Sequence, residues 1–154
     1  MRFIAALIVG ASTLASLALV GQEYRAALFG VGSEQVWIAS LGQEAPQVSV
    51  PMNARNMREL MGICAARESI ISLGLQSAAI RDSFRANCLS LAMQVLHDSP
   101  TYGAALLART VNLASPQEVA DSLRQAQTAA PYEAWQAKIR IALVFARLDP
   151  TADA

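Results

Sequence analysis

The chain has 154 residues, of which 54% are hydrophobic and 6% aromatic, and its 12 basic residues balance its 12 acidic ones. A protein that binds nucleic-acid phosphates carries a basic stripe, so this balance argues against a nucleic-acid partner. Eleven of the twelve basic residues are arginine, which is typical of a GC-rich bacterial genome. Frequent alanine and few aromatic residues favour an all-α protein.

An uncharged apolar run, Phe3–Val20, follows Arg2. Its length is near the lower limit for a helix that crosses about 30 Å of hydrocarbon. We therefore expect a signal-anchor over residues 1–30, which holds a single-pass protein in the bacterial inner membrane with its C-terminal domain in the periplasm. A cleaved signal peptide is the main alternative, although no small-x-small site directly follows the run. A buried helix of a globular domain is a third interpretation.

Residues 31–52 are expected to form a linker without helix. Gly30 and Gly32 precede this segment's only tryptophan, Trp37, and Pro46 and Pro51 interrupt its second half. Trp37 either lies at a membrane surface, where indoles are favoured, or folds back with its neighbour onto the helical domain. We favour the second arrangement, because an exposed tryptophan is unusual.

The remaining chain shows helical periodicity from end to end. N-cap residues precede three of the expected helices: Asn53, Ser77 and Ser115, the last with Pro116 and Glu118 as a capping box. We expect about five helices, arranged as antiparallel hairpins. They are predicted over residues 54–73, 78–97, 99–111, 116–130 and 132–148, in a helical domain of residues 53–149 that ends in a tail of residues 150–154.

Proline–tyrosine pairs recur near residues 100 and 131, and this spacing suggests a repeat. Ala120 occupies a small-residue position in the second helix of such a repeat, whereas Arg124 stands where an aromatic residue is expected. On these positions, residues 99–148 resemble the tetratricopeptide family. The resemblance implies a scaffold that binds a protein partner. Four residues match the contact positions of its first helix: Ala104, Leu107, Ala108 and Val111.

Cys64 and Cys88 are the only cysteines. Cys64 lies ten residues before Gly74 and Cys88 eleven after Ser77, so a hairpin that turns between Gly74 and Ser77 brings them to the same height. We expect a disulfide, which an oxidising compartment permits. Two buried free thiols are the alternative. Two cysteines and one distant histidine do not complete a metal site.

No motif indicates catalysis. His97 is the single histidine, and its place in the last turn of a helix suits the helix dipole better than a catalytic role. The sequence contains neither a nucleophile motif nor a glycine-rich phosphate loop. We therefore expect a protein that is not an enzyme and has no cofactor, no metal and no catalytic residue.

The last helix, residues 132–148, is apolar nearly all round, although a terminal helix normally presents a polar face to water. One interpretation is an exposed patch that binds a protein partner or a second copy. The alternative is that residues 31–50 fold back over this helix. The residues that would bind the partner are Trp135, Ile141, Val144, Phe145 and Leu148.

These features together predict a membrane-anchored scaffold or accessory subunit of the bacterial envelope. Residues 3–20 would hold it in the membrane, and its helical domain would bind a protein partner in a membrane assembly, for example one that builds a surface polymer. The alternative is a secreted periplasmic domain that binds a small ligand between its helices.

Overall fold

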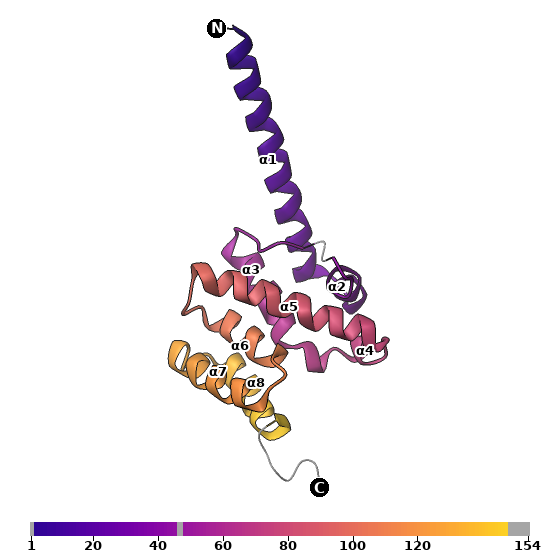
Figure 1. Ribbon diagram of the computed structural model, residues 1–154, viewed down its shortest axis with the longest axis vertical. Helices are drawn as coiled ribbons and strands as arrows, with labels where there is room; N and C mark the ends of the chain where they lie inside the picture. The colour runs from indigo at the N-terminus through magenta and orange to yellow at the C-terminus, as the bar shows by residue number, and fades with distance from the viewer. Residues whose placement is uncertain (1, 46–47, 148–154) are drawn as a thin grey trace.

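The computed structural model describes residues 2–45 and 48–147, except for the side chains of residues 2–9, 22, 25, 26, 28–31 and 147. Within these ranges the protein is all-helical, with eight α-helices, one short 3-10 helix and no strand (Figure 1). This confirms the predicted all-α class; the described part of residues 53–149 contains six α-helices where about five were expected. The helices are α1 (Arg2–Val31), α2 (Glu34–Leu41), α3 (Ala54–Ala65), η1 (Arg67–Ser69), α4 (Ile71–Gly74), α5 (Ala78–Asp98), α6 (Gly103–Asn112), α7 (Pro116–Ala129) and α8 (Ala134–Arg147).

Helix α1 projects from the other helices and meets them through its C-terminal end, which packs on α3 (Figure 1). Among the described residues, no helix combines the length and the apolar character that a membrane crossing requires. This finding overturns the predicted location as a single-pass inner-membrane protein with a periplasmic domain.

Glu23 joins α1 to the start of α3. Its carboxylate accepts hydrogen bonds from the backbone N–H groups of Met52, at 2.6 Å, and Asn53, at 3.0 Å, and from the side chain of Asn56, at 2.9 Å. The bond from Asn56 is the main reason why the pKa of Glu23 lies below its ordinary value; desolvation opposes it, and the two backbone bonds add smaller lowering contributions. A negative charge at a helix N-terminus is also favoured by the helix dipole.

The prediction that residues 31–52 form a linker without helix is wrong for Glu34–Leu41, which forms α2. Trp37 and Ile38 are half-buried against the core, so this part of the chain folds back onto the helical domain, as we favoured. It packs on α4 and α5 instead of covering α8. Buried Asn87 of α5 fixes the end of α2 by donating to the carbonyls of Leu41, at 2.8 Å, and Gln43, at 2.7 Å.

The helix predicted over residues 54–73 is divided into α3, η1 and α4. Extended backbone at Ile70 separates η1 from α4. Glu34 of α2 favours a new helix start there, because its carboxylate accepts hydrogen bonds from the backbone N–H of Ser72, at 2.9 Å, and from the Ser72 hydroxyl. The hydroxyl bond is the main reason why the pKa of Glu34 lies below its ordinary value.

The other helix boundaries follow local signals to different degrees. Ser77 caps α5 as predicted, since its hydroxyl accepts from the N–H of Ile80 at 3.4 Å. Pro116 begins α7, but Ser115 makes no side-chain capping bond, so the predicted capping box does not form. The helix predicted from residue 99 begins at Gly103, because Ser99 ends α5 and its carbonyl accepts from the N–H of Tyr102 at 3.0 Å in a turn.

Helix α6 occupies the centre of the molecule and packs against α3, α5 and α7. Nearly all of its residues are buried, which its run of alanines and leucines permits. Arg109 and Thr110 join it to α7. The Arg109 guanidinium donates to the Ser122 hydroxyl, at 2.9 Å, and to Gln125, at 2.8 Å, and the Thr110 hydroxyl lies 2.6 Å from that of Ser122. A satisfied polar contact therefore lies inside an otherwise apolar interface.

Candidate functional site

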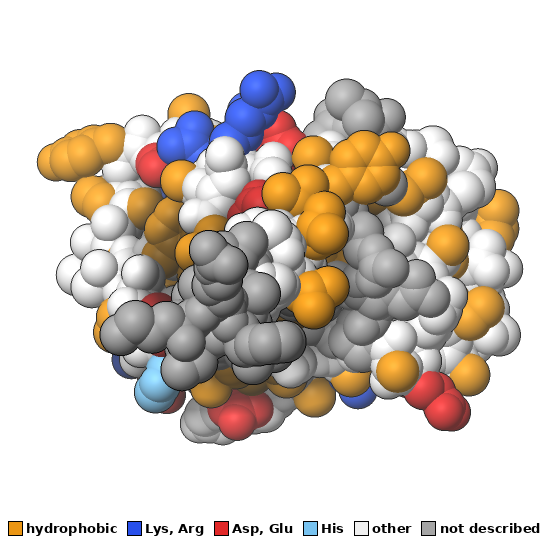
Figure 2. Space-filling view, turned by 90° about the horizontal axis from the view of Figure 1, so that it is seen from above, with side chains coloured by type: hydrophobic (Ala, Val, Ile, Leu, Met, Phe, Trp, Pro, Cys, Tyr) orange, Lys and Arg blue, Asp and Glu red, His pale blue; other side chains and the backbone are white. Residues whose placement is uncertain are grey.

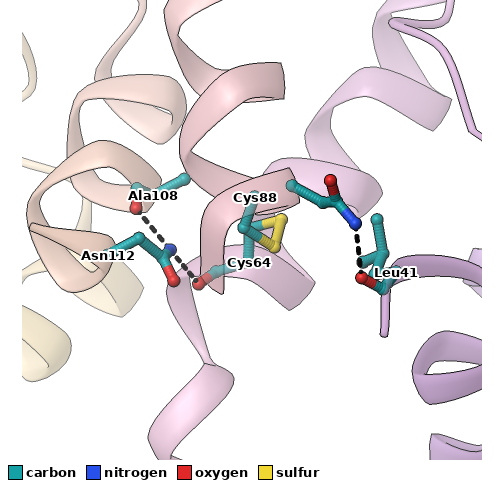
Figure 3. The surroundings of a disulfide bond; sticks show 6 residues. Leu41, Cys64, Cys88, Ala108 and Asn112 are labelled. Carbon is teal, nitrogen blue, oxygen red and sulfur yellow. Dashed lines mark hydrogen bonds between the residues drawn. A yellow bond between two sulfur atoms is a disulfide. The ribbon is translucent and has the colours of Figure 1, made fainter. Parts of the chain in front are cut away.

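Cys64 of α3 and Cys88 of α5 form a disulfide with a Cα–Cα distance of 5.4 Å (Figure 3). Both cysteines are fully buried. The predicted pairing is therefore confirmed. Beside it, buried Asn112 at the end of α6 donates from its amide nitrogen to the carbonyls of Cys64, at 3.1 Å, and Ala108, at 2.7 Å. The bond and the asparagine together fix α3 to both α5 and α6, so this region is a structural centre.

In part of the last helix, α8, polar and apolar residues lie in reversed positions, although Leu143 is buried and Lys138 is exposed as usual. Gln136 is 1% exposed and Arg140 is 6% exposed, and both lie on its buried side near Leu143. Ile141 is 58% exposed, and Phe145 is 64% exposed. A surface helix normally buries its apolar stripe and turns polar residues to water. The exposed apolar face of α8 is therefore the feature of the molecule that most needs a functional explanation.

A groove of about 330 Å³ runs between α7 and α8. Most of the surface that lines it is apolar, and it lies at the end of the molecule away from α1 (Figure 1). Its lining residues come from two turns of each helix, namely Leu123, Arg124 and Gln127 of α7 and Arg140, Ile141, Val144 and Phe145 of α8. We call these seven residues the α7–α8 groove.

Arg140 is the most buried charged residue of the groove. Its Nη1 donates to the carbonyl of Ala130, at 3.2 Å, and to the side-chain oxygen of Gln136, one turn earlier, at 3.4 Å. Gln136 is oriented in turn by Glu133, which accepts from its amide nitrogen at 3.2 Å. Both direct partners of Arg140 are neutral. Within the described parts of the chain, its cationic guanidinium has no carboxylate at ion-pair distance.

Three of the five residues predicted to bind a partner share the exposed face: Ile141, Val144 and Phe145. Trp135 lies elsewhere on α8, because it is half-buried against the core and its indole N–H donates to Glu133 at 2.6 Å. Leu148 lies outside the described residues. The structure thus brings together the three central residues of the predicted set and separates Trp135 from them.

The groove contains residues that the sequence did not single out, above all Arg140 and Leu123. Arg140 interrupts an apolar run, which by itself suggests a solvated side chain. The one available signal was its spacing, since Gln136, Arg140 and Leu143 are separated as residues on one face of a helix are. Burial of that face depends on α6 and α7, which local periodicity does not reveal.

A second pocket, of about 360 Å³, lies beside α4 and contains charges of both signs. Arg67, Arg81 and Arg85 line it together with Glu68 and Asp82, so their charges largely cancel. On the face that Figure 2 shows from above, basic side chains lie beside acidic ones, and hydrophobic side chains are spread over the remaining coloured surface. No group of three or more potential metal ligands occurs in the described ranges, and His97 is exposed in the last turn of α5.

No family model, curated protein or solved structure matches this chain. The resemblance of residues 99–148 to the tetratricopeptide family thus gains no support and stays a prediction. The function has to be inferred from the α7–α8 groove and from the burial and charge of the residues around it.

Proposed function

We propose that the protein is a scaffold or accessory subunit without catalytic activity, and that it binds a protein partner through the α7–α8 groove. The observation that carries the proposal is the reversed pattern of α8, which buries Gln136 and Arg140 and leaves Ile141 and Phe145 in water. Apolar side chains exposed next to one another are characteristic of interaction surfaces. The tetratricopeptide resemblance implies the same kind of function.

The partner that fits best is an amphipathic helix. A helix presents apolar side chains one turn apart, and a groove between two helices accepts such a row. Leu123 forms the floor of the α7–α8 groove, while Ile141, Val144 and Phe145 follow one another along α8. A small-ligand domain would enclose its ligand, whereas this groove is open to solvent along Ile141 and Phe145.

The charge of the groove argues against a second copy as the occupant. The seven residues that line the groove include Arg124 and Arg140 and no acidic residue. A symmetric pair would place α8 against α8, because a two-fold interface uses the same patch on both subunits. Like charges would then face each other across an apolar contact, which is unfavourable. We therefore propose a different protein as the partner.

The test is photo-crosslinking in cells from a benzoylphenylalanine at position 145, followed by binding of the crosslinked protein to the purified full chain. We expect one partner, a calorimetric stoichiometry near one to one, and loss of binding in Phe145→Asp. Because Phe145 is 64% exposed, this change should alter the free energy of unfolding by no more than about 0.5 kcal/mol.

The matched control is Leu75→Asp, which places the same charge at an apolar residue that is 83% exposed and outside the groove. This variant should bind the partner as the unchanged protein does. Equal loss of binding in both variants would overturn the proposal. So would unfolding of Phe145→Asp, since Phe145 would then belong to the core, or crosslinking of the chain to itself alone.

A further inference from the structure

We infer that Arg140 is a receptor for a carboxylate, and that the helix bound by the α7–α8 groove carries an aspartate or glutamate between its apolar residues. This inference rests on the proposed function, because it names the chemistry of the partner at the same site. It assigns Arg140 a role in binding, in contrast to the structural role of the disulfide region.

The guanidinium of Arg140 has donors to spare. An arginine offers five N–H groups in a planar fork that matches a carboxylate. Both hydrogen bonds of Arg140 within the described ranges leave from Nη1, towards the carbonyl of Ala130 and the side chain of Gln136. Its side chain also lines the groove. The remaining donors can therefore meet a group that enters from solvent.

The charge of Arg140 is poorly compensated where it lies. The side chain is 6% exposed, and a buried charge is costly unless it is paired. Glu133, the nearby acidic residue, acts on Arg140 only through Gln136, since its carboxylate accepts from Gln136 and from Trp135. A carboxylate from a partner would supply the missing counter-charge, and charge-assisted pairs of this kind are among the stronger hydrogen bonds.

Arg124, the other arginine of the groove, has a different environment. Its guanidinium pairs with Asp121 at 3.0 Å, and its side chain is 78% exposed. A partner carboxylate therefore gains more at Arg140, where water is displaced and no acidic residue of the described ranges competes. This contrast supplies a matched pair of variants, Arg140→Gln and Arg124→Gln, that remove one positive charge each from the same groove.

The experiment is a selection from a displayed library of helical peptides with fixed leucines one turn apart and random residues between them, against the full chain. We expect aspartate or glutamate to be enriched at one position. The enrichment should persist with Arg124→Gln and vanish with Arg140→Gln. For a selected peptide on the unchanged protein, replacing that glutamate by glutamine should weaken binding about tenfold or more.

The outcomes separate the two proposals. If Phe145→Asp blocks the selected peptides but they show no acidic preference, the carboxylate inference is wrong and the proposed function stands. If no peptide binds, or if Phe145→Asp has no effect on binding, the proposed function is wrong as well. If Arg140→Gln fails to fold, the glutamate-to-glutamine comparison decides the question, because it uses the unchanged protein.

Discussion

The region around the disulfide and the last helix, α8, bury polar groups in different ways. Around the disulfide, Asn87 and Asn112 are buried and donate to backbone carbonyls that a helix end leaves without partners. In α8, buried Arg140 is a charged group with neutral partners, while apolar Ile141 and Phe145 face water. In the first arrangement the amide nitrogens of both asparagines have partners inside the fold, although Asn112 Oδ1 has none within the described residues. The second arrangement is the one on which the proposed partner site rests.

The same contrast appears in how the helices are held. Helix α3 is bonded covalently to α5 and packs extensively on α6, whereas α8 packs mainly on α6 and α7 and through fewer residues. Regions with few buried apolar contacts open at a lower free energy than the core. We therefore expect α8 to be the more adaptable end, which suits a helix that rearranges slightly when its groove is filled.

Breaking the disulfide tests the core and should lower the free energy of unfolding more than any other change proposed below. The bond closes a loop with a sequence separation of 24 residues, for which chain entropy gives a stabilisation of about 3 kcal/mol. The free energy of unfolding in urea should fall by about this amount when the protein is unfolded and refolded under reducing conditions. Both sulfurs are buried, so reduction should require prior unfolding.

The control is a variant with alanine at Cys64 and Cys88, whose stability should not change when reductant is added. A protein that loses no stability on reduction would contradict the interpretation of this region as the structural centre. Binding of the partner at the groove should survive reduction wherever the domain stays folded, because the groove lies on α7 and α8.

Gly103→Ala tests the packing of α6 against Ala130 and Gln136 and should cause the second-largest loss of stability. A Cβ atom there would lie 2.6 Å from the Cβ of Ala130 and 3.2 Å from the side chain of Gln136. The Ala130 Cβ cannot rotate away from the added Cβ, so α6 would have to move away from Ala130 and Gln136. Gly103→Ala should therefore destabilise the protein by about 1–3 kcal/mol, as measured by chemical unfolding.

Gly62→Ala is the matched change within the core helix α3. No atom lies within 4 Å of its added Cβ, and alanine is a better helix former than glycine. This variant should be more stable by up to about 1 kcal/mol. If Gly103→Ala and Gly62→Ala changed the free energy of unfolding in the same direction, the close approach of Gly103 to Ala130 and Gln136 would not govern the effect of an alanine at position 103.

Local signals in the sequence accounted for much of the core. Counting outward from a turn between Gly74 and Ser77 placed Cys64 and Cys88 at one height and predicted the disulfide that the structure contains, although the helix assumed for that count is divided into α3, η1 and α4. Asn53 and Ser77 were recognisable as N-caps because their side chains accept from N–H groups only two or three residues ahead. Interactions over such short separations can be inferred without knowing the fold.

Interactions between distant segments could not be inferred in this way. Glu34 reaches Ser72 across 38 residues, and this contact, which favours a new helix start, divides the helix expected over residues 54–73. Arg140 similarly looked like a solvated residue, because its burial depends on how α6 and α7 pack around α8. An exposed apolar face was one of two interpretations of the composition of α8, but the cation beside it was not predicted.

Acid should produce the smallest change in the free energy of unfolding. This change should arise at the contacts of α1 and α2, and not at the disulfide. Hydrogen bonds from Asn56 and Ser72 hold the pKa values of Glu23 and Glu34 below the ordinary 4.5. A lowered folded pKa means that each carboxylate stabilises the fold above about pH 4.5 and that this contribution is lost as the pH falls through the folded value. The free energy of unfolding should thus decline as the pH falls below 4.5.

The amide protons of Asn53 and Ser72 report these two carboxylates directly, because each is donated to one of them. Their NMR shifts should titrate with midpoints below 4.5, and the titrations should disappear in Glu23→Gln and Glu34→Gln respectively. Exposed Glu44→Gln removes the same charge without touching either contact and should leave both titrations intact. Midpoints at or above the ordinary value would mean that α1 and α2 are not held by these bonds. The disulfide should be indifferent to the same acid, since it contains no titratable group, and that difference would separate the docking of α1 and α2 from the region around Cys64 and Cys88.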